Sequence, residues 1–67
     1  MNIILYSNNC PKCKILKQKL NDKNIVYEEV NDVDLMISKG FSEVPLLEID
    51  GEIYRFNDAV QWVNRTN

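Results

Sequence analysis

The pattern of apolar and polar residues is typical of a strand in residues 3–6 and of a helix from about Pro11 onward. Residues 3–6 (Ile-Ile-Leu-Tyr) form a short continuous apolar run, which is typical of a central strand covered on both faces. The polar residues 7–9 predict a loop, and Pro11 suits the first turn of a helix. The apolar stripe of this helix has helical spacing and consists of Cys13, Leu16 and Leu20, with Ile15 beside it. The pattern predicts a helix that begins near Pro11 and ends within residues 21–24.

A second strand and a short second helix are predicted next. Residues 25–30 (Ile-Val-Tyr-Glu-Glu-Val) are rich in strand-forming side chains. Asn31 or Asp32 can cap the helix that follows, and Gly40 can end it. The apolar side of this helix is expected to consist of Val33, Met36 and Ile37.

Two further strands are predicted around a tight turn. Pro45 lies at or just before the start of a strand over residues 46–49, one of the few places where a sheet tolerates proline. Asp50-Gly51 is a strong hairpin signal, and residues 52–56 form the returning strand.

A final helix completes an α/β order of β-α-β-α-β-β-α within one domain, residues 1–67. Asn57 or Asp58 is expected to cap this helix. Its inward side chains are expected to be Val60 and Val63, flanked by Trp62. The first two strands are joined through a helix and should be parallel, whereas the two-residue turn makes the last two antiparallel. We therefore expect a four-stranded mixed sheet with helices on both faces.

Length and composition set the broad class of the protein. The chain has 67 residues, 45% of them apolar, which favours a small folded globule over a disordered chain. Its net charge of −2 argues against a general nucleic-acid binder. No apolar run approaches the roughly 20 residues of a membrane span. Because Met1 leads directly into a strand pattern, we expect no signal peptide and a cytoplasmic location.

The two cysteines, Cys10 and Cys13, are separated by Pro11 and Lys12 at the start of the first predicted helix. Residues three apart on a helix have Cα atoms about 5 Å apart, within the roughly 4.4–6.8 Å that a disulfide requires. The positive end of the helix dipole favours a thiolate on the first cysteine. The spacing therefore favours a redox-active dithiol.

Other interpretations of the pair remain open. A purely structural disulfide around so short a loop is worth only about 2 kcal/mol. Tetrahedral zinc requires four ligands, and the chain has no histidine and no third cysteine. A zinc ion or iron–sulfur cluster would therefore have to be shared between two chains through Cys10, and incidental thiols are the third possibility.

Five of the eight basic residues lie on or beside this first helix: Lys12, Lys14, Lys17, Lys19 and Lys23. They form either an ordinary solvated face or a local positive field that favours a Cys10 thiolate and attracts an acidic partner surface.

Over essentially its whole length the chain resembles the thioredoxin-fold redoxins, specifically glutaredoxins and NrdH-type redoxins. The motifs that carry the resemblance are a first strand ending in Tyr6, the CPKC sequence of residues 10–13, Gly40-Phe41, Val44-Pro45 and Asn57-Asp58. The absence of a tryptophan before Cys10 separates the chain from thioredoxins proper.

The resemblance implies a dithiol–disulfide oxidoreductase. Cys10 would attack a substrate disulfide and Cys13 would resolve the mixed disulfide. The Val44-Pro45 bond would be cis, and Val44 would offer its backbone to the substrate. The residues expected to contact substrate are Tyr6, Pro11, Lys12, Val44, Pro45, Arg55 and Asp58.

Two departures from glutaredoxins bear on the partner. The residues before Cys10 are the neutral Ser7, Asn8 and Asn9, where glutaredoxins typically carry a basic residue. Arg55-Phe56 replaces the Gly-Gly that glutathione approaches closely in glutaredoxins. Asp58 is retained, and in glutaredoxins it meets the amino group of glutathione, although a plain N-cap explains it equally well.

The resemblance implies a monomer with no tightly bound cofactor and no metal, whose redox group is the Cys10–Cys13 disulfide. Its substrate would be a disulfide-containing protein, with ribonucleotide reductase as a candidate electron acceptor. The electron donor would be a thioredoxin reductase, or glutathione in the alternative of a glutathione-dependent glutaredoxin.

Overall fold

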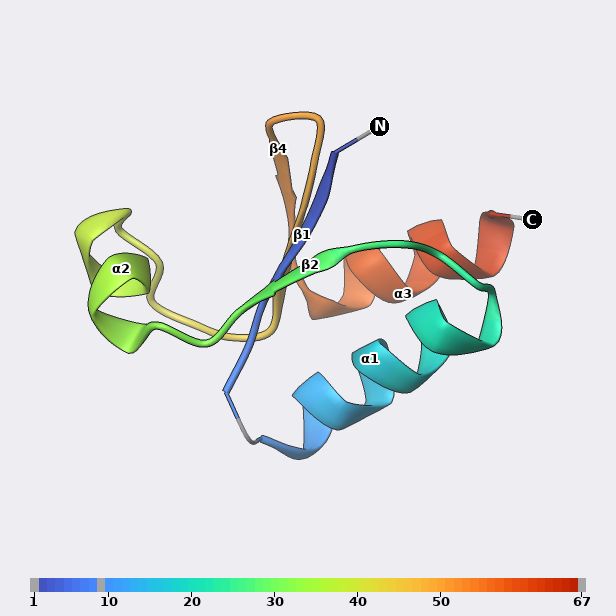
Figure 1. Cartoon of the computed structure of the whole chain (residues 1–67), viewed down its shortest axis with the longest axis horizontal. Coiled ribbons are helices and arrows are strands. Elements are labelled where there is room, and N and C mark those ends of the chain that lie inside the picture. Colours follow the sequence, from blue (N-terminus) through green and yellow to red (C-terminus); the bar gives the residue numbers. More distant parts are fainter. Residues whose placement is uncertain (1, 9, 67) are drawn as a thin grey trace.

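The fold has the predicted element order β-α-β-α-β-β-α in a computed structural model that describes residues 2–8 and 10–66 (Figure 1). The strands are β1 (Ile3–Tyr6), β2 (Glu28–Val30), β3 (Leu46–Ile49) and β4 (Glu52–Tyr54). The helices are α1 (Pro11–Asp22), α2 (Val33–Ser38) and α3 (Phe56–Arg65). Within the described ranges, no helix has the length and apolar character needed to cross a membrane.

The four strands form one mixed sheet in the order β2-β1-β3-β4. β1 pairs in parallel with β2, and β3 pairs antiparallel with both β1 and β4. Asp50 and Gly51 form the β3–β4 turn with φ angles of 50° and 90°, as expected for a primed hairpin turn. The predicted fold class and strand directions are therefore confirmed.

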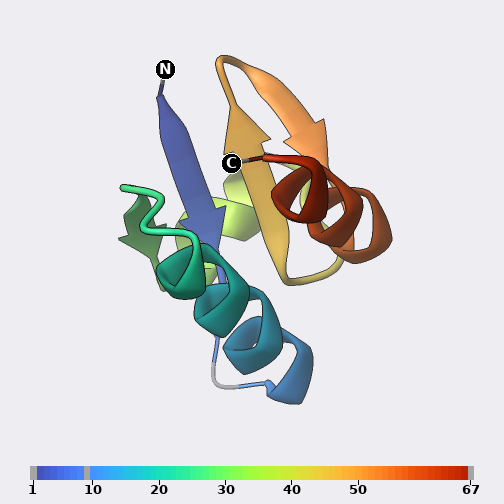
Figure 2. The ribbon, with the colours of Figure 1, turned by 90° about the vertical axis from the view of Figure 1, so that its right-hand side faces the viewer.

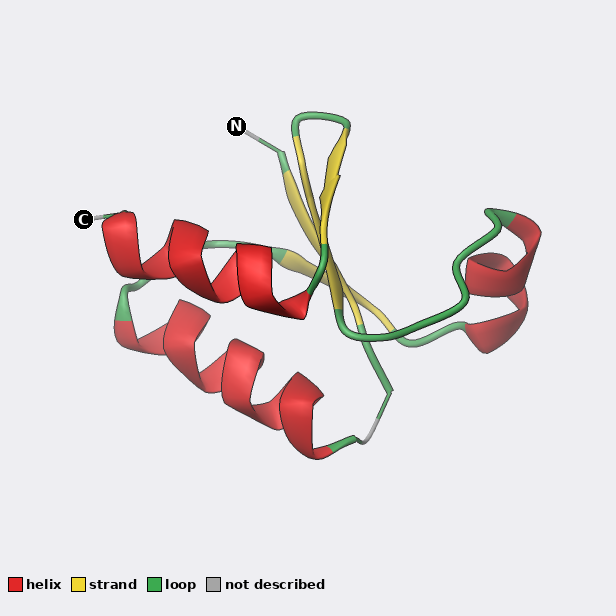
Figure 3. Ribbon diagram, turned by 180° about the vertical axis from the view of Figure 1, so that it is seen from behind, coloured by secondary structure: helices red, strands yellow, loops and turns green. Residues whose placement is uncertain are grey.

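Helices cover both faces of the sheet, as predicted. α1 and α3 lie side by side on one face, and α2 lies on the other (Figures 2 and 3). The main core lies under α1 and α3, where buried side chains of β1 and β3 alternate inward; it consists of Ile3, Leu5, Leu16, Leu20, Leu47, Ile49, Ala59 and Val63. Val60 and Trp62 are partly buried against this core, which confirms their predicted inward position.

The second strand is shorter than predicted, because residues 25–27 complete the end of α1 instead of pairing with β1. Asn24 adopts a left-handed φ of 56°, and the N–H of Ile25 donates to the carbonyl of Leu20 at 3.0 Å. Such a bond back into the last helical turn satisfies a carbonyl that the helix leaves free. Val26 is 89% exposed, whereas Ile25 and Tyr27 pack against the core.

Helix α2 is capped as predicted, but only one residue of its predicted apolar side is buried. The Asp32 carboxylate accepts a hydrogen bond from the N–H of Leu35 at 3.2 Å, and Gly40 follows the helix with a φ of 82°. Met36 is buried, but Val33 is 52% exposed and Ile37 is 65% exposed. Val33 and Ile37 of the predicted apolar side are therefore largely exposed, because this short helix rests on the sheet mainly through Met36.

Helix α3 begins earlier than predicted. Arg55 is its N-cap residue, without a side-chain capping bond, and its carbonyl accepts from the N–H of Ala59 at 2.7 Å. The predicted caps Asn57 and Asp58 instead lie in the first turn, and the predicted strand 52–56 ends at Tyr54. Phe56, which packs against the main core as the first helical residue, explains the earlier start.

Candidate functional site

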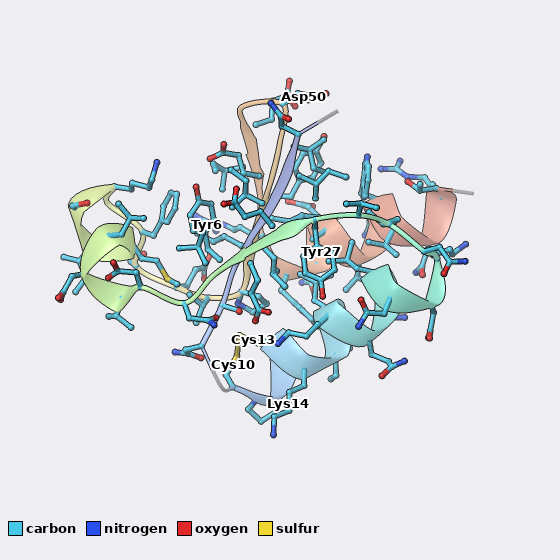
Figure 4. The ribbon with its side chains drawn as sticks, viewed as in Figure 1. Tyr6, Cys10, Cys13, Lys14, Tyr27 and Asp50 are labelled. Atoms are coloured by element: carbon cyan, nitrogen blue, oxygen red, sulfur yellow. A yellow bond between two sulfur atoms is a disulfide. The ribbon has the colours of Figure 1, made fainter. Side chains whose placement is uncertain are left out.

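The two cysteines form a disulfide at the start of α1, as Figure 4 shows. Cys10 is the N-cap residue with extended backbone, Pro11 occupies the first turn, and Cys13 lies one turn into the helix. Their Cα atoms are 5.2 Å apart, as expected for residues at this helical spacing. The sequence therefore places both sulfur atoms at the N-terminal end of a helix.

The two sulfur-bearing residues differ in exposure. Cys13 belongs to the buried stripe of α1 and is 1% exposed, whereas Cys10 is partly exposed at the cap position. The backbone N–H of Cys13 donates a hydrogen bond to Cys10 Sγ at 3.1 Å. The outer sulfur can therefore meet a partner while the inner sulfur lies behind it.

Asn8 contacts both cysteines. The sequence predicts only a neutral loop residue at this position, so these contacts were not expected. Its Oδ1 atom accepts a hydrogen bond from the N–H of Cys10 at 3.1 Å. The same oxygen lies 3.7 Å from Cys13 Sγ. An asparagine two residues before a helix cap suggests such a turn, but nothing in the sequence indicates the second contact. Asn9 lies outside the described residues.

A recess of about 330 Å³ brings together five of the residues predicted to contact substrate: Lys12, Val44, Pro45, Arg55 and Asp58. Glu43, Phe56 and Asn57 complete its lining. The Val44–Pro45 peptide bond is cis, as the family resemblance implies. Lys12, which lies between the two cysteines in the chain, connects this recess to the segment that carries the disulfide.

Two side-chain interactions shape this recess. Lys12 Nζ lies 5.5 Å from the centre of the Phe56 ring, within the range of a cation–π interaction. Arg55 Nε lies 3.1 Å from Glu43 Oε1 in an ion pair whose side chains are 79% and 52% exposed. The recess thus presents cationic groups, of which Arg55 already has a partner.

The other two predicted contact residues lie outside this recess. Pro11 is exposed beside the disulfide in the first turn of α1. Tyr6 is only 2% exposed and lies on the α2 face, where its ring is 4.9 Å from that of Phe41. Burial, followed by the nearby Glu48, raises the pKa of Tyr6 above its usual value. The prediction that the Tyr6 ring packs internally is confirmed, but so buried a side chain does not line a substrate surface.

A polar cluster joins α1 to the ends of β1 and β2. Lys17 Nζ forms a 2.6 Å ion pair with Glu29 Oε2, which also accepts from the hydroxyl of the buried Ser7 at 3.1 Å. With its side-chain nitrogen directed inward, Asn31 donates to Ser7 Oγ at 3.0 Å. The Lys17 hydrogen bond lowers the pKa of Glu29, and the same bond raises the pKa of Lys17. Lys17 is therefore an anchoring residue, whereas the Lys14 side chain points away from the sheet (Figure 4).

Metal ligands do not cluster in the part of the chain that the structure describes. Among residues 2–8 and 10–66, no group of three or more histidine, cysteine, aspartate or glutamate side chains is arranged to hold a metal ion. Both cysteine sulfurs are engaged in the disulfide.

Comparison with known proteins supports the fold assignment. A crystal structure of a point mutant of the thioredoxin-like protein BC3987 matches this chain with a TM-score of 0.77. The two chains are 28% identical, and the match covers 98% of this chain and 97% of the other. No family model matches the chain, and no curated protein matches it. The chain therefore has a thioredoxin-like fold that carries a CxxC pair at disulfide distance.

Proposed function

We propose that the protein is a thiol–disulfide oxidoreductase that reduces disulfides in other proteins. The observation that carries the proposal is the unequal exposure of the pair, with Cys10 partly exposed at a helix N-terminus and Cys13 buried behind it. Attack by one sulfur and resolution by the other require such an arrangement. The match to a thioredoxin-like protein supports the same reaction class.

In the proposed cycle, the reduced Cys10 thiolate attacks one sulfur of a substrate disulfide. A Cys10–substrate bond forms, the substrate disulfide breaks, and the second substrate sulfur leaves as a thiolate. Cys13 then loses its proton and attacks Cys10 Sγ, which breaks the mixed disulfide and releases the other substrate sulfur. Two electrons have passed to the substrate, and Cys10 and Cys13 are again a disulfide.

The helix N-terminus activates Cys10 in this cycle. A thiolate at the cap position lies at the positive end of the α1 dipole and accepts the N–H of Cys13. A fall in thiol pKa from about 8.5 to about 7 raises the thiolate fraction at neutral pH roughly 15-fold, while lower basicity removes about fivefold in nucleophilicity. The first attack therefore gains about threefold, whereas in the second step the leaving group is the substrate sulfur, because Cys13 attacks Cys10 Sγ.

The recess beside the disulfide is the proposed substrate surface. Val44 lies in it just before β3, where an extended substrate segment can pair with the backbone. Pro11 and Lys12 border the attacking sulfur, and Pro45, Arg55 and Asp58 complete the proposed contacts.

We propose an NrdH-type electron donor, monomeric and cytoplasmic, which is recycled by a thioredoxin reductase and supplies ribonucleotide reductase. A glutathione-dependent glutaredoxin is the second candidate, since the recess gathers Lys12 and Arg55, which suit carboxylates, with Asp58, which suits an amino group. Two features favour the first candidate: Glu43 already neutralises Arg55, and Phe56 occupies the space where glutaredoxins carry glycine.

Coupled assays with each electron donor test the proposal. Oxidation of NADPH is measured with the protein, a disulfide substrate such as insulin, and either thioredoxin reductase or glutathione plus glutathione reductase. Turnover with thioredoxin reductase alone supports the NrdH type, and turnover with glutathione alone supports the second candidate. Stoichiometric metal in the purified protein, with no turnover from either donor, would instead support a metal-binding module.

A further inference from the structure

We propose that Asn8 is a positioning residue that keeps the proton of the reduced pair on Cys13 through its side-chain amide oxygen. This inference rests on the proposed function, because it concerns the dithiol form of the same pair. The carrying observation is that Asn8 Oδ1 accepts from the N–H of Cys10 at 3.1 Å and lies 3.7 Å from Cys13 Sγ.

The contact with the N–H of Cys10 determines which side-chain atom of Asn8 faces Cys13 Sγ. The N–H of Cys10 is a donor, so the Asn8 atom facing it must be the carbonyl oxygen rather than the NH₂ group. The same oxygen therefore faces Cys13 Sγ. An amide oxygen is an acceptor and the negative end of a dipole, and it favours a neutral S–H group over a thiolate.

The preference of Asn8 Oδ1 for a neutral S–H group takes effect when the disulfide is reduced. Two electrons and one proton convert the disulfide into one thiol and one thiolate. Cys10 Sγ accepts a backbone N–H, which favours the charged form, whereas Cys13 Sγ faces an acceptor, which favours the protonated form. The two contacts therefore assign the thiolate to the exposed sulfur and the proton to the buried one.

Asn8 also directs that proton toward the substrate. Its side chain is exposed and lines a recess of about 210 Å³ together with residues of α2 and the segment before β3. This recess shares Glu43 and Val44 with the proposed substrate surface, so an S–H group that points to Asn8 Oδ1 points toward the border between the two recesses. After the first attack, the departing substrate thiolate takes this proton, and the Cys13 thiolate then attacks Cys10.

Charged groups on the surrounding elements give no competing hydrogen bond to either sulfur among the described residues. The charged residues of these elements are Lys12, Lys14, Lys17, Lys19 and Asp22 on α1, Glu28 and Glu29 on β2, and Asp58 and Arg65 on α3. Lys17 and Glu29 are paired with each other, and Lys12 lies over the Phe56 ring. Asn8 is therefore the side chain best placed to set the protonation of Cys13.

Two substitutions of Asn8 separate this role from simple support of the loop. Asn8→Ala removes the acceptor, whereas Asn8→Asp keeps an oxygen for the N–H of Cys10 but adds a negative charge beside Cys13. Asn64→Ala, an exposed asparagine on α3, is the matched control. The Cys13 thiolate fraction is followed in the reduced proteins by NMR of its ¹³Cβ resonance across a pH series.

We expect Asn8→Ala to raise the Cys13 thiolate fraction at a given pH by about fivefold, the effect of losing one hydrogen bond. Asn8→Asp should lower that fraction by about tenfold, because a like charge disfavours the thiolate. Asn64→Ala should leave it unchanged. A purely structural role predicts an unchanged fraction in Asn8→Ala, and that result, or an Asn8→Asp variant that behaves like the wild type, would overturn the proposal.

The titration is independent of turnover, so the two proposals can fail separately. If the wild type reduces no disulfide but the Cys13 titration shifts as expected, the proposed function is wrong and the role of Asn8 in proton placement stands. If the wild type is active but neither Asn8 variant shifts the titration, the proposed function stands and this inference is wrong.

Discussion

The N–H of Cys13 donates a hydrogen bond to Cys10 Sγ at 3.1 Å, so the partly exposed sulfur caps the helix in which the buried sulfur lies. This relationship makes the two cysteines chemically unequal. The Cys10 sulfur receives the favourable end of the α1 dipole and faces outward, whereas Cys13 is enclosed by the core. Their proposed roles are therefore not interchangeable.

Substitution of each cysteine should show this inequality. Cys13→Ser retains the attacking sulfur but cannot resolve the mixed disulfide, so it should accumulate a covalent adduct with an oxidised protein target. Cys10→Ser should form little adduct, because its remaining thiol is buried. Non-reducing gels and intact-protein mass spectrometry measure the adducts, and equal trapping by both variants would contradict the assigned roles.

The ion pair of Lys17 with Glu29 should make stability depend on pH. The pKa of Glu29 is lowered in the folded state, so its stabilising effect is present above the usual pKa of 4.5 and is lost as pH falls through the lowered value. Glu29→Gln should therefore lower Tm most near neutral pH, and the difference from the wild type should shrink in acid. Glu43→Gln, in the more exposed pair with Arg55, is the control and should have the smaller effect near neutral pH.

Ionisation of Tyr6 should destabilise the protein in alkali. Burial and Glu48 raise the pKa of Tyr6 above 10.0, so the stabilisation from its neutral form is complete below pH 10 and is lost as pH rises through the raised value. Tyr6→Phe keeps the ring against Phe41 but removes this ionisation. Denaturant unfolding above pH 10 should show a steeper loss of stability for the wild type than for Tyr6→Phe, and identical slopes would count against the prediction.

Neighbouring apolar residues of α1 should differ sharply in their contribution to stability. Leu16 is fully buried, and Leu16→Ala should cost about 2–5 kcal/mol in unfolding free energy. A domain of this size is expected to have a total of about 3–10 kcal/mol, so the loss is a large part of it. Ile15 is 48% exposed, and Ile15→Ala should cost about 1 kcal/mol or less. Urea unfolding followed by circular dichroism measures both, and similar losses would contradict the observed burial.

Much of the fold could be predicted from the sequence because its signals are local. The apolar run Ile3–Tyr6 and the hairpin signal Asp50-Gly51 correspond to a strand and a turn in the structure. The spacing of Cys13, Leu16 and Leu20 correctly identified the buried stripe of α1. In each of these segments, local backbone preference and burial favour the same structure.

Boundaries and the face of α2 were less predictable because they depend on tertiary packing. Arg55 begins α3 although it is not a preferred cap residue, since its side chain makes no capping bond and Phe56 packs against the core. Val33 and Ile37 follow the apolar spacing of α2, yet only Met36 finds a buried position. Because α2 has only six residues, its packing against the sheet determines which of its side chains is buried.

The candidate site was predicted where it depends on the cysteine spacing and missed where it depends on side-chain direction. The Cys10–Cys13 pair lies at disulfide distance, as its spacing predicts, and five of the residues expected to contact substrate line one recess, whose role stays a prediction. The contacts of Asn8 with both cysteines follow from the path of a loop that joins strand and helix, and a single sequence does not encode that path visibly.

The light anchoring of α2 has a dynamic consequence. A segment with few buried apolar contacts opens at lower free energy than the layer formed by α1 and α3, so its amide hydrogens should exchange with solvent first. Such opening would reshape the border of the recess near Val44 while leaving the helix with the cysteines in place. Under the proposed function, this arrangement would place a rigid disulfide beside an adaptable rim, which would suit the reduction of targets of different shape.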